Sequence, residues 1–137
     1  MLYNLETSKQ PKAKVTAKSV SQQGIDIFYK NEESFSGATI NIPDGTPRIR
    51  PYVFEDMWPE NGFSVVVPDS VHTIMDYAFA NTDCRKVYMS ANVKTIPAHA
   101  FEDCNIEVLY LHRTTSTAGY PWSTTEEDKS FSILFVD

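Results

Sequence analysis

Two cysteines and three histidines are the residues of this chain best suited to nucleophilic or metal chemistry. They are Cys84, Cys104, His72, His99 and His112. A catalytic thiol needs a nearby base that keeps it ionised, and a zinc site needs closely spaced ligands. The histidine spacing does not fit a zinc site, and no C-x-x-C pair is present. We therefore expect no catalytic residue, no metal and no cofactor. A cysteine-dependent enzyme remains an alternative that no motif supports.

Other signatures of catalysis are also absent from the sequence. There is no G-x-G-x-x-G, no G-K-[ST] loop and no G-x-S-x-G. The acidic pairs Glu55-Asp56 and Glu102-Asp103 and the run Glu126-Glu127-Asp128 are more simply explained as solvated turns. These observations favour a non-enzymatic protein.

The feature that organises the chain is an internal repeat between residues 40 and 112. Phe54, Phe79 and Phe101 are spaced by 25 and 22 residues. An isoleucine stands five positions before each phenylalanine, and a small or medium apolar residue directly precedes it: Ile49, Ile74 and Ile96, then Val53, Ala78 and Ala100. A repeat of this length is typical of solenoids, in which each unit buries its apolar face on the next.

A short segment of alternating apolar residues precedes each turn of the repeat. The pairs are Ile40/Ile42, Val65/Val67, Val87/Met89 and, in a shortened fourth copy, Leu109/Leu111. Alternation at a period of two predicts strands with one buried face. The fold class we predict is mainly β, a short solenoid of about three repeats of 22–25 residues.

Two of the repeat copies resemble a known family. The stretches "VPDSVHTIMDYAF" and "ANVKTIPAHAFEDC" are similar to the BspA-like leucine-rich repeats, whose motif is roughly I-P-x-S-V-x-x-I-G-x-x-A-F-x-x-C. The motif glycine is replaced by Arg50, Met75 or Pro97, and the first copy is degenerate. The resemblance implies a leucine-rich-repeat-like solenoid, with Cys84 and Cys104 as buried core thiols. A disulfide or redox pair is the other interpretation of the two cysteines.

Four segments follow from these patterns. They are an extended basic arm (1–14), an N-terminal β-hairpin cap (15–39), the solenoid (40–112) and a C-terminal loop with a capping strand (113–137). Within the solenoid, "DYAFAN" and "AHAFED" are expected to form single helical turns. Trp58 is expected to fold back onto the core, because large aromatic residues are seldom exposed.

The outward side of the predicted strands is the best candidate binding surface. If the alternating residues point inward, then Asn41, Val66, Tyr88 and Tyr110 point outward, with Lys86 beside them and His112 just after the last strand. Stacked tyrosines on adjacent strands suit protein binding, because tyrosine offers large area at a low entropy cost. The alternative is a plain sheet face, since tyrosine also favours strands.

Charge is unevenly distributed along the chain. The formal net charge is −6, but residues 1–24 carry four lysines and one glutamate, and the rest carries eight basic and seventeen acidic residues. The basic arm residues Lys9, Lys12, Lys14 and Lys18 suit docking on an acidic surface, including that of a second copy. A solvated tail is the alternative. The acidic body argues against nucleic acid as the main partner.

The function predicted from these features is a non-catalytic protein–protein interaction or assembly module. No apolar run of about 18 residues suggests a membrane span, and the start has no signal peptide core. We expect synthesis in the cytoplasm. The resemblance implies a component of a larger assembly, such as a phage virion or a microbial surface structure. A soluble inhibitor or regulator that binds a host protein through the exposed strand face is the alternative.

Overall fold

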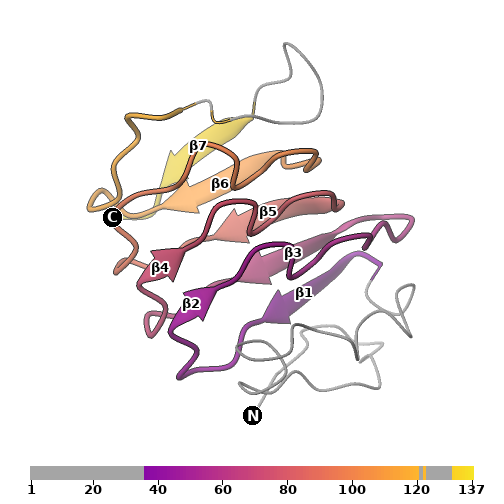
Figure 1. Cartoon of the computed structure of the whole chain (residues 1–137), viewed down its shortest axis with the longest axis horizontal. Coiled ribbons are helices and arrows are strands. Elements are labelled where there is room, and N and C mark those ends of the chain that lie inside the picture. The colour runs from indigo at the N-terminus through magenta and orange to yellow at the C-terminus, as the bar shows by residue number, and fades with distance from the viewer. Residues whose placement is uncertain (1–35, 121, 123–130) are drawn as a thin grey trace.

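The computed structural model describes residues 36–120, 122 and 131–137, and seven strands lie in these residues (Figure 1). They are β1 (Ala38–Asn41), β2 (Arg48–Ile49), β3 (Phe63–Val66), β4 (Thr73–Ile74), β5 (Cys84–Tyr88), β6 (Val108–Leu111) and β7 (Ser132–Phe135). Five of them form one parallel sheet in the order β1-β3-β5-β6-β7. Strands β2 and β4 form a second, two-stranded parallel sheet.

The chain winds as a parallel β-solenoid of about four turns, and the prediction of a mainly β solenoid is confirmed. The first two turns pass from the large sheet through the small sheet and back, by way of β2 and then β4, whereas no small-sheet strand lies between β5 and β6 (Figure 1). The inward side chains of the large sheet come into register as a ladder. Ile40, Val65, Val87 and Leu109 are all fully buried, and Ile133 packs against the same cluster: this is the alternating pattern of the sequence in three dimensions.

A column of phenylalanine rings runs through the middle of the core. The rings of Phe54 and Phe79 stack with centroids 5.6 Å apart, and those of Phe79 and Phe101 with centroids 5.5 Å apart. All three side chains are fully buried. The column continues into Trp122 and Phe131, both of which contact Phe101. The repeat spacing of phenylalanine in the sequence therefore places one ring of the column in each of these three turns of the solenoid, which we call coils to distinguish them from tight turns.

The turns that follow the phenylalanines use a left-handed backbone. Asp56, Asn81 and Asp103, each two residues after a phenylalanine, have φ angles of 67°, 56° and 54°. Aspartate and asparagine are the non-glycine residues that adopt this region most readily. Hydrogen bonds then link the turns, from Asp56 N–H to the Asn81 carbonyl and from Asn81 N–H to the Glu102 carbonyl.

Two expectations about this region are wrong. The stretches "DYAFAN" and "AHAFED" form tight turns with hydrogen bonds between residues three positions apart. Positive φ angles interrupt a right-handed helix at Tyr77 in the first stretch and end the turn at Asn81 and Asp103.

Trp58 does not fold onto the core but is 41% exposed, while Trp122 seals that core with 4% exposure. The buried residues of this loop are Met57, Pro59 and Gly62.

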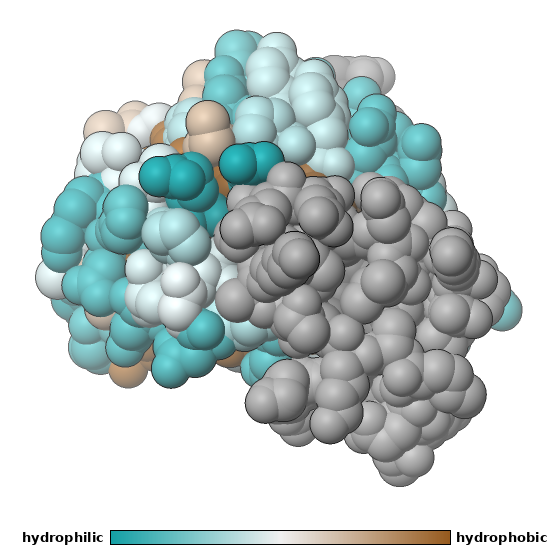
Figure 2. Space-filling model, turned by 60° about the horizontal axis from the view of Figure 1, so that its bottom comes forward, coloured by the Kyte–Doolittle hydropathy of each residue, from teal (hydrophilic) through white to brown (hydrophobic). Residues whose placement is uncertain are grey.

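The predicted basic arm and all but the last residues of the predicted hairpin cap lie outside the described residues, so both stay predictions. Within the described part of the chain we find no helix with the length and apolar character needed to cross a bilayer. Where Figure 2 shows described residues, the surface is mostly hydrophilic, and the hydrophobic areas are small and separate.

Candidate functional site

The outer face of the five-stranded sheet carries two rows of side chains. Strand register places Asn41, Val66, Tyr88, Tyr110 and Leu134 in one row, which we call the tyrosine row. The neighbouring row consists of Thr39, Ser64, Lys86, Val108 and Ser132. The predicted row of residues 41, 66, 88 and 110 is therefore brought together, with Leu134 as a fifth member.

Two tyrosine rings form the centre of the tyrosine row. The rings of Tyr88 and Tyr110 are almost parallel, at 5°, and their centroids are 4.2 Å apart. Tyr88 is 36% exposed and Leu134 is 49% exposed, whereas Val66 and Tyr110 are partly buried. Partial burial, together with the neighbouring Tyr110 hydroxyl, raises the pKa of Tyr88 above its ordinary value. Apart from Asn41, the row therefore presents a surface of aromatic and aliphatic side chains, without a charged residue.

A groove of about 340 Å³ lies where this row meets the carboxyl ends of the strands. Its lining includes Val66, Tyr88, Tyr110, His112 and Val136. Asp69 adds a carboxylate to the rim. The groove is open and mostly apolar, and its lining also includes His112 and Asp69, which is a combination that suits a protein side chain.

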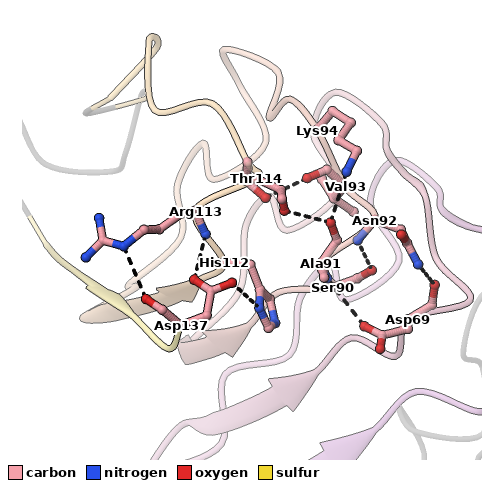
Figure 3. Close-up of polar contacts among 11 residues, drawn as sticks. Asp69, Ser90, Ala91, Asn92, Val93, Lys94, His112, Arg113, Thr114 and Asp137 are labelled. Carbon is pink, nitrogen blue, oxygen red and sulfur yellow. Dashed lines mark hydrogen bonds and ion pairs between the residues drawn. The ribbon is translucent and has the colours of Figure 1, made fainter.

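His112, which lines the groove, contacts Asp137 at the end of the chain's last described segment (Figure 3). The Asp137 carboxylate accepts a hydrogen bond from the Arg113 backbone N–H at 2.9 Å and lies 3.2 Å from His112 Nδ1. Arg113 Nε also donates to the Asp137 carbonyl, and its guanidinium lies 4.4 Å from the Phe135 ring centroid. The Arg113 N–H and His112 together lower the pKa of Asp137.

The adjoining loops are joined coil to coil by further hydrogen bonds (Figure 3). Asn92 donates from Nδ2 to the Asp69 carbonyl at 2.7 Å, and the Ala91 N–H donates to the Asp69 carboxylate. The Thr114 hydroxyl donates to the Ala91 carbonyl at 2.9 Å. Each bond connects residues 22 or 23 positions apart, which is one repeat. The loops beside the groove are therefore hydrogen-bonded to the equivalent loops of the neighbouring coils.

Residues 14–121 match the family described as "BspA type Leucine rich repeat region (6 copies)". The chain belongs to the BspA-type leucine-rich repeat family. The match extends beyond residues 40–112, where the resemblance is visible by eye. Neither the curated proteins nor the solved structures gave a match.

Lys86, one of the predicted site residues, lies outside the groove of this BspA-type solenoid. It stands in the neighbouring row and lines a separate hollow of about 250 Å³ near the start of the strands, with Arg85 and Glu107. Arg85 is the extra residue where the register between β3 and β5 shifts, and its guanidinium forms an ion pair with Asp83. The arm lysines (Lys9, Lys12, Lys14 and Lys18) lie outside the described residues.

The cysteines of the BspA-type repeats are core residues. Cys84 and Cys104 are buried thiols that do not form a disulfide. Cys104 Sγ donates to the Cys84 carbonyl at 3.3 Å, and Cys84 Sγ contacts the Lys86 carbonyl at 3.6 Å. Burial raises the pKa of Cys84 well above its ordinary value, and Cys104 adds to this effect. Both features oppose a thiolate nucleophile at neutral pH.

The remaining histidines lie elsewhere on the solenoid. His72 is exposed and hydrogen-bonded to Thr73, and His99 Nδ1 lies 3.1 Å from the Asp76 carboxylate. No group of three or more histidine, cysteine, aspartate or glutamate side chains is arranged for metal binding among the described residues.

Sequence reasoning missed two features. The first is the contribution of the C-terminal segment, which lacks the repeat motif: Leu134 extends the tyrosine row, Val136 lines the groove and Asp137 contacts His112. Alternation in "SFSILFVD" is the signal that places Leu134 outward. The second is another aromatic stack, Tyr52–Tyr77–His99, with centroids 5.4 and 5.0 Å apart. Its signal is an aromatic residue two positions before each repeat phenylalanine.

Proposed function

We propose that this protein is a non-catalytic protein–protein interaction module that holds its partner on the tyrosine row and the adjoining groove. The observation that carries the proposal is the stacked Tyr88–Tyr110 pair on the outer face of the sheet, where Tyr88 is exposed and Tyr110 is partly buried. Tyrosine is enriched at the energetic centres of interfaces, and its ordering costs little entropy when the ring is already fixed. Membership in a solenoid repeat family supports the same role.

The setting we propose is a larger assembly, such as a phage virion or a microbial surface structure. Partner subunits in such an assembly would cover the exposed apolar members of the row, Tyr88 and Leu134. The test is quantitative mass spectrometry of purified particles or cell envelopes from the source. A fixed, repeated stoichiometry supports the assembly role, whereas a complex with one soluble protein supports a regulator.

The binding surface is tested by replacing both Tyr88 and Tyr110 with serine. We expect affinity for the partner to fall at least about tenfold while the fold is retained, because hot-spot residues cost about 2 kcal/mol or more each when truncated. The measurement is isothermal titration or surface plasmon resonance with the partner found in the particles.

The matched control is the double variant Tyr52→Ser/Tyr77→Ser. It removes another stacked tyrosine pair, on the turn side of the solenoid, where Tyr52 is 45% exposed. Its affinity should equal that of the wild type. Equal loss in both double variants would mean that the effect is not local to the tyrosine row.

A further inference from the structure

Strand β7 forms an edge of the five-stranded sheet and has a hydrogen-bonding side that faces away from β6. The Ser132 N–H donates to the Glu107 carbonyl at 3.0 Å, and the Val136 N–H donates to the Leu111 carbonyl at 2.9 Å. Successive peptide groups of a strand point to opposite edges. The N–H and C=O groups of Ile133 and Phe135 therefore point away from β6, where the described residues supply no strand.

The side chains of this edge are apolar and exposed. Leu134, Phe135 and Val136 are 49%, 39% and 52% exposed, in direct succession. Residues 132–136 carry no charge, and the carboxylate of Asp137 is held by Arg113 and His112. Edge strands are usually protected from pairing by charged residues, proline or a bulge. Within the described residues 132–136, strand β7 has no charged residue, no proline and no bulge.

The opposite end of the sheet is different. The inward residues of β1 and the position after it are covered, because Ala38, Ile40 and Ile42 are exposed by only 1%, 0% and 3%. A head-to-tail stack would require both ends of the solenoid to be open. A two-fold contact uses the same surface from each copy, and it needs only the open β7 end.

We propose that two copies of this chain associate by antiparallel pairing of β7 with β7 about a two-fold axis at Leu134. In this register Ile133 of each copy faces Phe135 of the other as a hydrogen-bonded pair, so the four outward N–H and C=O groups of each copy find partners. Leu134 then faces Leu134 of the second copy as the central, non-hydrogen-bonded pair.

This pairing would extend the tyrosine row across both copies. Leu134 follows Tyr110 in the row, so the axis joins two rows end to end in a ten-stranded sheet. On the inner side, Ile133 and Phe135 would cover each other across the open end of the core. A strand of another protein could make the same hydrogen bonds. Only pairing between two copies of this chain places Leu134 of one copy opposite Leu134 of the other.

The size and charge of the contact predict its strength. The three exposed side chains present roughly 300 Å² per copy, less than the ~800 Å² per partner of a standard interface. We therefore expect a reversible dimer with a dissociation constant between about 10 µM and a few hundred micromolar. Because the net charge is −6 while the edge is neutral, added salt should strengthen the dimer by screening repulsion between the bodies.

The first test is sedimentation velocity of the full chain from about 1 µM to about 1 mM, a range that spans the expected dissociation constant. We expect a shift from monomer to dimer. Leu134→Lys should stay monomeric throughout, because it places a charge on the axis. Met75→Lys is the matched control, since Met75 is 37% exposed on the turn side, and it should dimerise like the wild type. A monomeric wild type at the highest concentration overturns the proposal, as does unchanged dimerisation of Leu134→Lys.

The second test measures the register by cross-linking. Antiparallel pairing about Leu134 sets the two Cα atoms of residue 134 about 4.5 Å apart, within the range of a disulfide. Residue 132 of one copy would lie about 14 Å from residue 132 of the other, which is too far. Under mild oxidation Leu134→Cys should form a linked dimer at least about tenfold faster than Ser132→Cys, since a disulfide depends on this geometry. Equal rates would overturn the register.

These tests do not depend on the proposed partner. The Tyr88→Ser/Tyr110→Ser variant should dimerise normally, because neither tyrosine lies on β7. Loss of partner binding in that variant with a monomeric wild type would leave the interaction role intact and remove the β7 pairing. If the wild type is dimeric and the tyrosine variant still binds the partner normally, the β7 pairing is supported and the tyrosine row is removed as the binding surface.

Discussion

At the scale of single residues, the solenoid is built from identical positions that touch their counterparts in the next coil. Phe79 contacts both Phe54 and Phe101, and the Asn81 side chain donates to the Asp56 carboxylate at 2.8 Å. One substitution in a middle coil therefore affects its contacts with both neighbouring coils. A substitution in a terminal coil affects only one.

Phe79→Ala should lower the free energy of unfolding by about 3–5 kcal/mol, because it leaves a cavity in the middle of the ring column. Urea denaturation followed by circular dichroism measures this change. Tyr77→Ala is a suitable control, since it removes a ring of similar size from the less buried outer stack. A loss below about 1 kcal/mol for Phe79→Ala would be incompatible with the column.

The two cysteines should not react with thiol reagents in the native protein. Both side chains are buried, and the raised pKa of Cys84 keeps its thiol protonated at neutral pH. Ellman's reagent should detect no thiol until the chain is unfolded, and two thiols afterwards. Rapid modification of the folded protein, or an activity that alkylation abolishes, would instead favour the cysteine-dependent enzyme.

At the scale of elements, β7 is the strand that depends most on side-chain anchors. It is paired on one side, its start is held by a hydrogen bond from the Tyr120 hydroxyl to the Phe131 carbonyl, and its end is held by Asp137. The other strands of the large sheet are continued by turns that are hydrogen-bonded from coil to coil. Conditions that release either anchor should loosen β7 before the rest of the sheet.

Acid should release the end of β7. The pKa of Asp137 is lowered in the folded state, chiefly by the Arg113 N–H, so the folded protein binds fewer protons at this carboxylate than the unfolded chain. Its stabilising contribution is complete above the ordinary aspartate pKa and is lost as the pH falls through the lowered value. Carboxyl chemical shifts should give an Asp137 pKa below the usual range, and exchange protection of the Val136 amide should fall over the same interval.

The control for this titration is Asp137→Asn, in which the Val136 protection should no longer change with pH in the acid range. An Asp137 carboxyl that titrates at the ordinary value or above it would contradict the hydrogen-bonded arrangement in Figure 3.

The repeat motif made part of this architecture predictable. Where apolar alternation and the phenylalanine spacing recur together, as at Val87 and Phe101, the strand, its inward face and the outward position of Tyr88 follow directly. The loop around Trp58 was not predictable in this way, because average burial says little about one residue in an irregular insertion. The turns were not predicted either, because positive φ angles at Tyr77 and Asn81 depend on hydrogen bonds to the next coil.

The candidate site was predictable to the same extent. Tyr88 and Tyr110 are placed together by the repeat, and their side-by-side position needs only the alternation rule. Leu134 and Asp137 reach the same surface after a segment without the motif, so their positions depend on where the chain re-enters the sheet. The contact between His112 and Asp137, which are 25 residues apart, leaves no local pattern in the sequence.

At the scale of the whole molecule, association by the basic arm and association by β7 should respond to salt in opposite ways. Deleting residues 1–14 removes three of the four arm lysines and should abolish any association that weakens with salt, because opposite charges are screened. Light scattering at low and high ionic strength, with and without these residues, measures both effects. If the full chain and the truncated chain behave alike at low salt, the arm has no role in assembly.

The parallel register of the large sheet has a mechanical consequence. The hydrogen bonds between β3, β5 and β6 run along the solenoid axis, so tension applied to the two ends of that axis loads one row of bonds at a time. Such an unzipping geometry resists less force than a sheet whose strands are sheared past one another. Coils would detach singly from an end, and each would release 22–25 residues of chain. This is roughly 75 Å of extended length per coil. We therefore expect the molecule to lengthen in discrete steps when its two ends are pulled apart.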